Sequence, residues 1–402
     1  LYILIIKHSN KIFKSKKQLI ITICIVSVLF ALIIPYTSTD VYSYIANGWS
    51  ASYYHENPYY KSVGQVSDEY QVKDQMQNKV ANCWRYETVV YGPLWTLICK
   101  LLTSISFGNI DVALAIFKGT NLIVHLINSI LIWKITHKKK LVLIYGTNPA
   151  ILFEALSNVH NDIFIVFVTK KKNLILSVAF VAMATAIKYL GILILPFIIL
   201  YHLRGKNILE KIKYCVLYGL EFIVILVGFY AIYVRDLNIF AGLFIQQSKY
   251  NRSIMLVFYY LIGEQSTNIL KTALLVVFAI LYVYTVIKLL LNNNTKIFSS
   301  YIREYSTLLY IFTFILITNF NSWYILWLFP TLMFLNGKNI RLIINLSYTV
   351  EVAYIGSFAL YSEAQNLGVL YIFLVAIVTG ILTSMPMVKN KVEHLSNKIE
   401  IR

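Results

Sequence analysis

The feature that most constrains this chain is a series of apolar runs that recurs from Leu19 to Met385. Several runs approach the ~20 helical residues that cross about 30 Å of hydrocarbon. Helices satisfy their own backbone groups in lipid, and the runs lack the residue-by-residue alternation of a membrane β-barrel. Charged residues make up only 13% of the chain, which is about half the share in soluble domains. We therefore expect an all-α polytopic membrane protein.

The basic residues argue for a membrane topology rather than for a nucleic-acid partner. The formal net charge is +18, which in a soluble domain would suggest nucleic acid. Here the lysines and arginines form short clusters between apolar runs, as expected for loops on the cytoplasmic side. The four cysteines show no spacing typical of a zinc site. We expect no nucleic-acid partner, no cofactor and no indicated metal site.

The charge pattern also orients the first part of the chain. Five lysines precede the first span, 19–36, which reads as an uncleaved signal anchor with the N-terminus in the cytoplasm. The polar stretch 37–90 then lies outside and carries an acidic excess. Were 92–107 a span, the next span, 111–135, would deliver the lysines at 134–140 to the outer side. We therefore predict that 92–107 is an interfacial helix within an outer loop, 37–110.

The rest of the chain completes a twelve-span arrangement in one domain, 1–402. Residues 173–203 make about 46 Å of helix, too long for one span. Lys188 interrupts them, so we predict a hairpin that turns outside at this lysine. A second outer loop, 235–266, contains a short apolar helix at 254–263. The other predicted spans are 141–157, 163–169, 214–234, 267–290, 305–319, 323–337, 341–360 and 367–386, with a cytoplasmic C-terminus.

Polar residues of the first outer loop are candidates for chemistry. Asp40 follows the first span at the membrane boundary. Its carboxylate suits a general base, although an acid at this place also suits a helix cap. Arg85 is a candidate partner for a phosphate. Tyr91 opens the sequence Tyr-Gly-Pro-Leu-Trp, in which the proline suits the first turn of a helix.

A second constellation contains Glu154, His160, Asn161 and Asp162. Ionisable groups at membrane depth are costly and usually functional, although a polar helix end that faces water would look similar. One histidine and one aspartate do not complete a metal shell. Lys188 needs a partner, which is either an anionic lipid phosphate or one of the carboxylates Glu154 and Asp162.

The later outer segments add cations and aromatic rings. Arg235, Lys249 and Arg252 are further candidates for phosphate contacts. Trp323 and Tyr324 could stack on a sugar, or they could belong to the aromatic belt of the membrane interface.

Together, the acids, cations and rings at one membrane face fit transfer of a glycosyl group from a lipid-linked phosphate donor. A transporter or flippase would place such groups near the bilayer midplane. A surface-polysaccharide polymerase or ligase often carries its large outer loop late in the chain, whereas the large loop is early here. Both classes remain the alternatives.

The order of these motifs resembles the GT-C superfamily of integral membrane glycosyltransferases. Over residues 38–330 the chain is most similar to the bacterial polyprenol-phosphate-mannose-dependent mannosyltransferases of the α-(1→6) type. The motifs are Asp40, Gly-Trp, Asn-Pro-Tyr, Tyr-Gly-Pro-Leu-Trp, Asn-x-His-Asn-Asp, Ile-Lys-Tyr and Ser-Trp-Tyr-Ile-Leu-Trp. As a departure from such enzymes, we expect a short C-terminal part without a soluble outer domain.

The resemblance implies a GT-C fold with juxtamembrane helices in the first outer loop. Asp40 would be the general base, His160–Asp162 would lie near the donor phosphate and the acceptor, and Lys188 would belong to the donor pocket. The reaction would invert the anomeric centre. It would move mannose from a polyprenyl-phosphate donor to a cell-envelope glycan or glycolipid, at the outer face of a bacterial plasma membrane.

Overall fold

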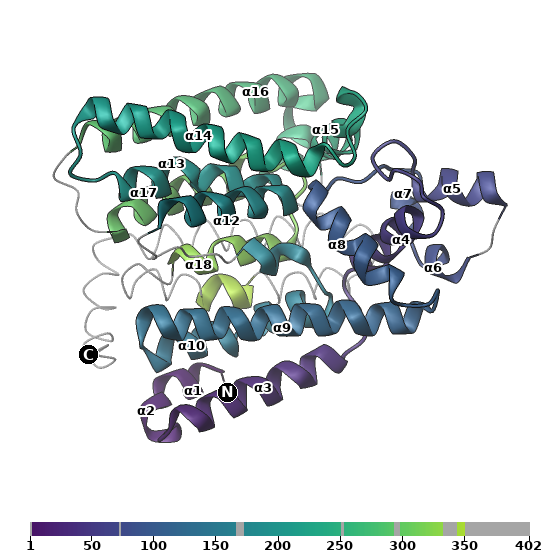
Figure 1. Ribbon diagram of the computed structural model, residues 1–402, viewed down its shortest axis with the longest axis horizontal. Helices are drawn as coiled ribbons and strands as arrows, with labels where there is room; N and C mark the ends of the chain where they lie inside the picture. Colours follow the sequence, from purple (N-terminus) through teal and green to yellow (C-terminus); the bar gives the residue numbers. More distant parts are fainter. Residues whose placement is uncertain are drawn as a thin grey trace.

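Helices form almost all of the regular structure in the computed structural model. It describes residues 2–71, 74–165, 173–250, 253–292, 298–332 and 344–349, and no strand occurs among them. The predicted all-α class is confirmed. Long helices run side by side in one body, and a group of short helices forms a cap at one end of it (Figure 1).

The body contains the long apolar helices and several short, interrupted ones. Among the described residues, three helices are long and apolar enough to cross a membrane: α9 (Ile110–Thr136), α14 (Ile208–Tyr230) and α16 (Ile254–Leu291). The other body elements are α1 (Tyr2–Lys7), α2 (Ser9–Ile12), α3 (Lys16–Leu32), α10 (Lys139–Gly146), α11 (Pro149–Ile151), η1 (Leu152–Ser157), η2 (Asn161–Ile165), α12 (Leu174–Ile187), η3 (Tyr189–Ile194), α13 (Leu195–His202), α17 (Phe298–Ile311), η5 (Phe312–Leu316), η6 (Ser322–Trp327) and α18 (Phe329–Leu332).

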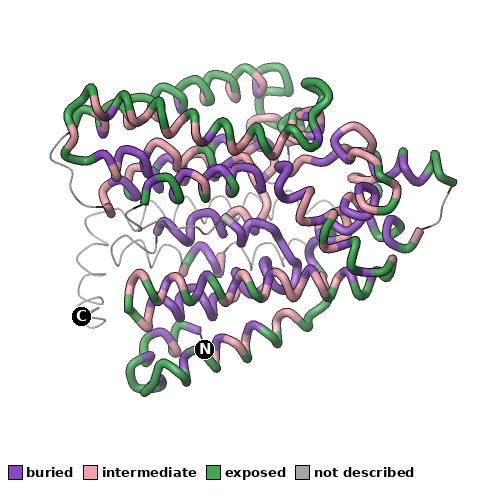
Figure 2. Tube along the Cα trace, viewed as in Figure 1, coloured by how far each residue is buried: buried purple, intermediate pink, exposed green. Residues whose placement is uncertain are grey.

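Exposed side chains on the outer helices are apolar, as a lipid environment requires. On α14, Val216, Leu220 and Val224 are exposed, and exposed residues dominate α14 and α16 (Figure 2). Helix α16 is broken at Gly263, whose φ of 78° lies outside the helical region. The break separates the predicted short helix 254–263 from the predicted span 267–290.

The twelve predicted spans are not all continuous helices. The span predicted at 141–157 consists of α10, α11 and η1, because the chain leaves helical geometry at Asn148 just before a proline. The first span ends at Leu32 instead of residue 36, before Pro35. The predicted spans 341–360 and 367–386, and the end of 163–169, lie outside the described residues, apart from 344–349.

The hairpin predicted at Lys188 is present. Leu174 at the start of α12 and Leu203 just after α13 belong to one buried cluster. Two ends of a 30-residue segment meet there only if the chain reverses between them. Lys188 is the extended residue, with φ −146° and ψ 125°, between α12 and η3.

The cap consists of the first outer loop, with α4 (Asp40–Ser52), α5 (Val63–Tyr70), α6 (Gln75–Asn78), α7 (Asn82–Arg85) and α8 (Pro93–Ser104). Helix α8 has 12 residues, about 18 Å, so it is too short to span a bilayer. It crosses α4 closely, and a Cβ on Gly48 would lie 2.5 Å from the Cys99 carbonyl oxygen. A short helix therefore lies in the predicted segment 92–107, and its position at the membrane interface stays a prediction.

The cap is attached to the body next to the hairpin. The Gly92 N–H donates to the Ile187 carbonyl oxygen at 3.0 Å, and a Cβ on Gly92 would lie 2.3 Å from the Ala186 carbonyl oxygen. The predicted second outer loop, with η4 (Leu237–Phe240) and α15 (Ala241–Ser248), also contacts the cap, since the Tyr60 hydroxyl donates to the Asp236 carbonyl oxygen at 2.9 Å.

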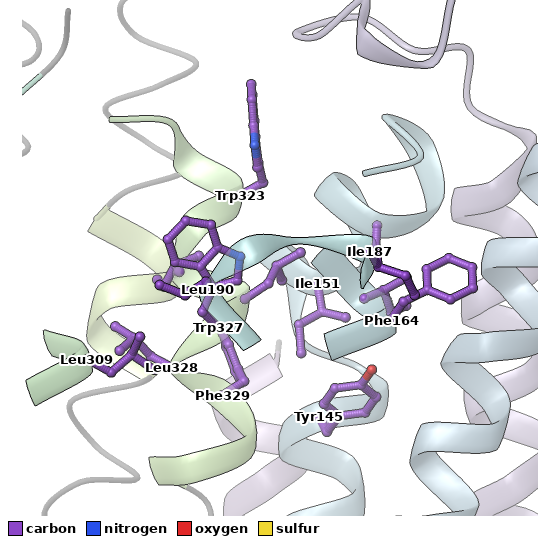
Figure 3. Close-up of a cluster of buried hydrophobic side chains, with 14 of the residues drawn as sticks. Tyr145, Ile151, Phe164, Ile187, Leu190, Leu309, Trp323, Trp327, Leu328 and Phe329 are labelled. Atoms are coloured by element: carbon purple, nitrogen blue, oxygen red, sulfur yellow. The ribbon is translucent and has the colours of Figure 1, made fainter. Parts of the chain in front are cut away.

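A buried apolar cluster lies where the interrupted elements of the body meet (Figure 3). Trp327 packs inside it beside Leu190, whereas Trp323 extends away from it. Trp323 is the ring that stacks on His160 of the site described below. The cluster therefore fixes the segment 322–329 against the body and leaves Trp323 directed to polar residues.

The close contact between α4 and α8 gives a first prediction. Gly48→Val would force a side chain against the Cys99 backbone, and overpacking of this kind costs about 1–3 kcal/mol. We expect a lower thermal unfolding midpoint for the protein in lipid nanodiscs. Gly119→Ala on α9 is the matched control, because a Cβ there meets nothing within 4 Å. Equal midpoints for the two variants would contradict the described packing.

Candidate active site

Three acidic side chains meet at the end of the body that faces the cap. Asp40 is the first residue of α4 in the cap. Glu154 lies in η1 and Asp162 lies in η2, both in the body. Asp40 keeps 17% of its side chain exposed, whereas Glu154 and Asp162 are fully buried. The candidate site therefore has one accessible carboxylate above two buried ones.

His160 lies between two of these carboxylates. Its Nδ1 is 3.7 Å from Asp40 Oδ2, and its Nε2 is 3.3 Å from Glu154 Oε2. Neither contact has hydrogen-bond alignment. The imidazole is fully buried and stacks on Trp323 at a centroid distance of 3.7 Å. This arrangement fixes the ring plane and connects the accessible acid to the buried Glu154.

Neighbouring polar groups hold Glu154 and the loop that carries His160. Glu154 accepts hydrogen bonds from Asn158 Nδ2 at 2.9 Å and from the Ser322 hydroxyl. The Asn121 amide of α9 donates to the carbonyl oxygens of Ala155, at 2.8 Å, and His160, at 3.1 Å. Element η1 is a π-helical turn, a feature frequent at functional sites.

Lys188 pairs with Asp162, one of the two carboxylates considered as its partner. Its Nζ lies 2.5 Å from Asp162 Oδ1 and 5.0 Å from the ring centroids of both Tyr324 and Trp327. The Trp327 indole also donates to Asp162 Oδ1. Because 15% of the lysine side chain remains exposed, its ammonium group borders the site while its charge is balanced by Asp162.

Several buried polar atoms of the site have no hydrogen-bond partner among the residues that the structure describes. Besides the His160 ring nitrogens, they include both amide atoms of Asn161 and the second carboxylate oxygen of Asp162. Both residues are fully buried. Buried polar groups are nearly always hydrogen-bonded, so unpaired ones call for an explanation. An amide and a carboxylate together offer donors and acceptors that suit the hydroxyl groups of a sugar.

Tyr91 connects the cap to the accessible carboxylate. Its hydroxyl donates to Asp40 Oδ2 at 3.2 Å, and the Tyr44 hydroxyl donates to Tyr91 at 3.4 Å. Burial and the nearby Asp40 raise the pKa of Tyr91 well above its usual value, so its phenol remains a donor at physiological pH. The helix-cap role considered for Asp40 is not seen, because the N-cap of α4 is Thr39.

The structure brings together most of the predicted site residues: Asp40, Tyr91, Glu154, His160, Asn161, Asp162, Lys188, Trp323 and Tyr324. The prediction did not include Asn158, Ser322 and Trp327, which hold the buried acids. The sequence signal for Ser322 and Trp327 was the motif Ser-Trp-Tyr-Ile-Leu-Trp, of which they are the first and last residues.

Three other predicted cations lie in different surroundings. Arg85 on α7 donates to the Gln77 carbonyl oxygen at 3.4 Å. Lys249 pairs with Glu87, and Arg235 lies 5.6 Å above the Tyr60 ring. In the part of the chain that the structure describes, no contact joins Arg85 to the acidic cluster, so its role at the site stays a prediction. Arg252 lies outside the described residues.

The described residues contain no group of three or more His, Cys, Asp or Glu side chains arranged to hold a metal ion.

The buried ion pair generates a prediction about stability. Lys188→Gln would leave Asp162 without its cation, which typically costs about 3–5 kcal/mol at a buried pair. We expect a clearly lower unfolding midpoint in nanodiscs. Adding Asp162→Asn should recover most of the loss, since the unpaired charge is then gone. If the single and double variants unfold at the same temperature, the pair is not the source of the effect.

Comparison with known protein families assigns the chain. The family model described as alpha-(1→6)-mannopyranosyltransferase, N-terminal domain, matches residues 2–204, about half of the chain. The match includes Asp40, the segment 154–162 and Lys188. Neither the curated proteins nor the solved structures gave a match. The chain therefore belongs to the alpha-(1→6)-mannopyranosyltransferase family, which supports glycosyltransferase activity.

Proposed function

We propose that this glycosyltransferase moves mannose from a polyprenyl-phosphate donor to a cell-envelope glycan or glycolipid with inversion at the anomeric carbon, in a GT-C-type arrangement. The site would face the outer side of a bacterial plasma membrane, with both termini in the cytoplasm. The observation that carries the proposal is the accessible Asp40 carboxylate backed by His160 and Glu154. The proposal needs no cofactor.

Asp40 is the group best placed to act as a general base. In the reaction, the acceptor hydroxyl oxygen bonds to the anomeric carbon while the bond from that carbon to the phosphate oxygen breaks. The hydroxyl proton passes to the Asp40 carboxylate, and polyprenyl phosphate leaves as the anion. Tyr91 donates to one oxygen of this carboxylate and orients it.

Lys188 is the cation nearest to the charge that develops on the leaving phosphate. Asp162 occupies one side of its ammonium group, and the remaining N–H donors are free to face the donor. Positive charge placed before the reaction lowers the barrier most where negative charge develops. The rings of Tyr324 and Trp327 stack on each other at 4.2 Å and hold the lysine in this position.

Sugar recognition fits the unpaired atoms of Asn161 and Asp162. Their free donors and acceptor are buried beside Lys188 and the His160 ring. A site built to bind hydroxyl groups discriminates strongly against ligands without them, because its polar atoms would stay unpaired.

A transporter or flippase, or a polysaccharide polymerase or ligase, remains the alternative class. The position of the cluster supports the transferase. Its residues lie at the end of the body beneath the cap, with Asp40 and Tyr91 contributed by the cap itself. Transport sites lie near the middle of the membrane helices.

The central prediction concerns the base. Asp40→Asn should lower transfer of radiolabelled mannose from polyprenyl phosphate mannose by about 10²–10⁴-fold, because the amide cannot accept the proton. Purified protein in nanodiscs and a mannoside acceptor suffice for the assay. The matched control is Asp111→Asn, an exposed acid at the start of α9, which should retain wild-type turnover. Full turnover by Asp40→Asn would show that another group is the base.

A second prediction separates ligand binding from folding. Asn161→Ala should leave the unfolding midpoint nearly unchanged, because the side chain makes no hydrogen bond among the described residues. It should nevertheless raise the KM for the donor or the acceptor severalfold. Asn121→Ala is the contrasting variant, because that amide makes two buried hydrogen bonds and its loss should lower the midpoint. A strongly destabilised Asn161→Ala protein with unchanged KM would refute the binding role.

A further inference from the structure

Four aromatic rings form a continuous row on the cap, away from the acidic cluster. Trp49 stacks on Tyr53 with a centroid distance of 4.6 Å and an interplanar angle of 7°. Tyr53 contacts Tyr54 at 5.0 Å, and Tyr54 contacts Tyr70 at 4.8 Å. We call these four residues the ring row. It joins the end of α4 to the end of α5.

The ring row presents its surface to the outside. Tyr53 is 60% exposed and Tyr70 is 43% exposed, whereas Trp49 is buried beneath Tyr53. Rings that served only to pack the cap would be buried like Trp49. Helices α5 and α6 lie on the side of the cap away from the long helices (Figure 1), so this part of the row projects away from the body.

Carboxylates fix the rings from their edges. Asp74 accepts from the Trp49 indole N–H at 2.5 Å and from the Tyr54 hydroxyl at 3.0 Å. Glu56 accepts from the Tyr70 hydroxyl at 3.1 Å and pairs with Lys61 at 2.8 Å. The rings are therefore held in place before any ligand arrives, which reduces the entropy cost of binding.

The chemistry of the row favours a carbohydrate over a lipid surface. Aromatic faces pack against the C–H faces of sugar rings, while carboxylates and a lysine at the rim can bind hydroxyl groups. Bilayer hydrocarbon would oppose the charges of Glu56, Lys61 and Asp74.

The position of the row relates it to the base. Asp40 begins α4 and Tyr53 directly follows its last residue, so the two are separated by about 20 Å along the helix. This span exceeds one sugar and matches a short chain of them. A glycan whose terminal hydroxyl reaches Asp40 could therefore place a sugar several units behind it at the row.

We propose that the ring row is a binding site for the growing glycan acceptor, several sugars behind the hydroxyl that is mannosylated. This inference rests on the proposed mannosyl transfer, because that reaction defines the class of acceptor. It predicts that long oligosaccharide acceptors bind more tightly than short ones and that the difference depends on Tyr53 and Tyr70.

Direct binding tests the site without turnover. The full chain in lipid nanodiscs is titrated calorimetrically with α-(1→6)-linked mannohexaose and with mannobiose. We expect the hexasaccharide to bind more tightly, and Tyr53→Ala to weaken its binding about tenfold, as for loss of one aromatic contact. Tyr53→Trp should restore binding. Tyr86→Ala is the matched control, an exposed cap tyrosine bonded to Asp68 that no ring contact connects to the row.

Transfer assays give the second readout. Tyr53→Ala and Tyr70→Ala should raise the KM for mannohexaose and leave the KM for mannobiose and both kcat values unchanged. If the wild-type protein binds the two sugars equally, or the variants change both KM values alike, the rings serve the membrane interface and the proposal is wrong. Hexasaccharide binding through Tyr53 without transfer from polyprenyl phosphate mannose would instead refute the proposed donor.

Discussion

Carboxylates next to a membrane require compensation, and this requirement organises the whole site. Asp162 is neutralised by Lys188. Glu154 accepts hydrogen bonds from Asn158 and Ser322, and the His160 imidazole lies 3.3 Å from it. Only Asp40 remains partly open to solvent, held by Tyr91. An unpaired charge inside a protein is costly. The pairs Asp40–Tyr91, Asp162–Lys188 and Glu154–Ser322 therefore tie together segments that lie far apart in the sequence.

The interrupted helices follow from the same requirement. The segment 141–157 is not one continuous helix. It is interrupted at Asn148-Pro149 and ends in a π-helical turn, and this backbone brings Glu154 next to His160. The hairpin at Lys188 likewise places a lysine where a straight helix would bury it in lipid. Irregular backbone at membrane depth is tolerated where protein surrounds it, and here it carries the polar cluster.

Features set by chain length and charge could be predicted from the sequence. The lysines at 134–140 and the length of 173–203 were enough to find the short helix α8 and the hairpin. The partner of Lys188 could not be chosen, because Glu154 and Asp162 are equivalent by spacing and only packing separates them. The roles of Ser322 and Trp327 depend on a contact across more than 160 residues, which no local pattern encodes. Arg85 was selected for its charge alone, and its surroundings in the cap give that charge a backbone partner instead.

Neighbouring buried asparagines differ in how many hydrogen bonds their side chains make. This difference indicates where a bound substrate is expected to contribute free energy of binding. The Asn158 amide is bonded through both its oxygen and its nitrogen, and the Asn121 nitrogen donates two hydrogen bonds. Asn161 is equally buried, and its side chain makes no hydrogen bond among the described residues. Stability alone would favour an apolar residue at that position. A residue that weakens the empty protein is expected where a bound ligand supplies the missing hydrogen bonds, because their energy is then gained only on binding. The acidic cluster is therefore both the most constrained part of this structure and the part left incomplete for its substrate.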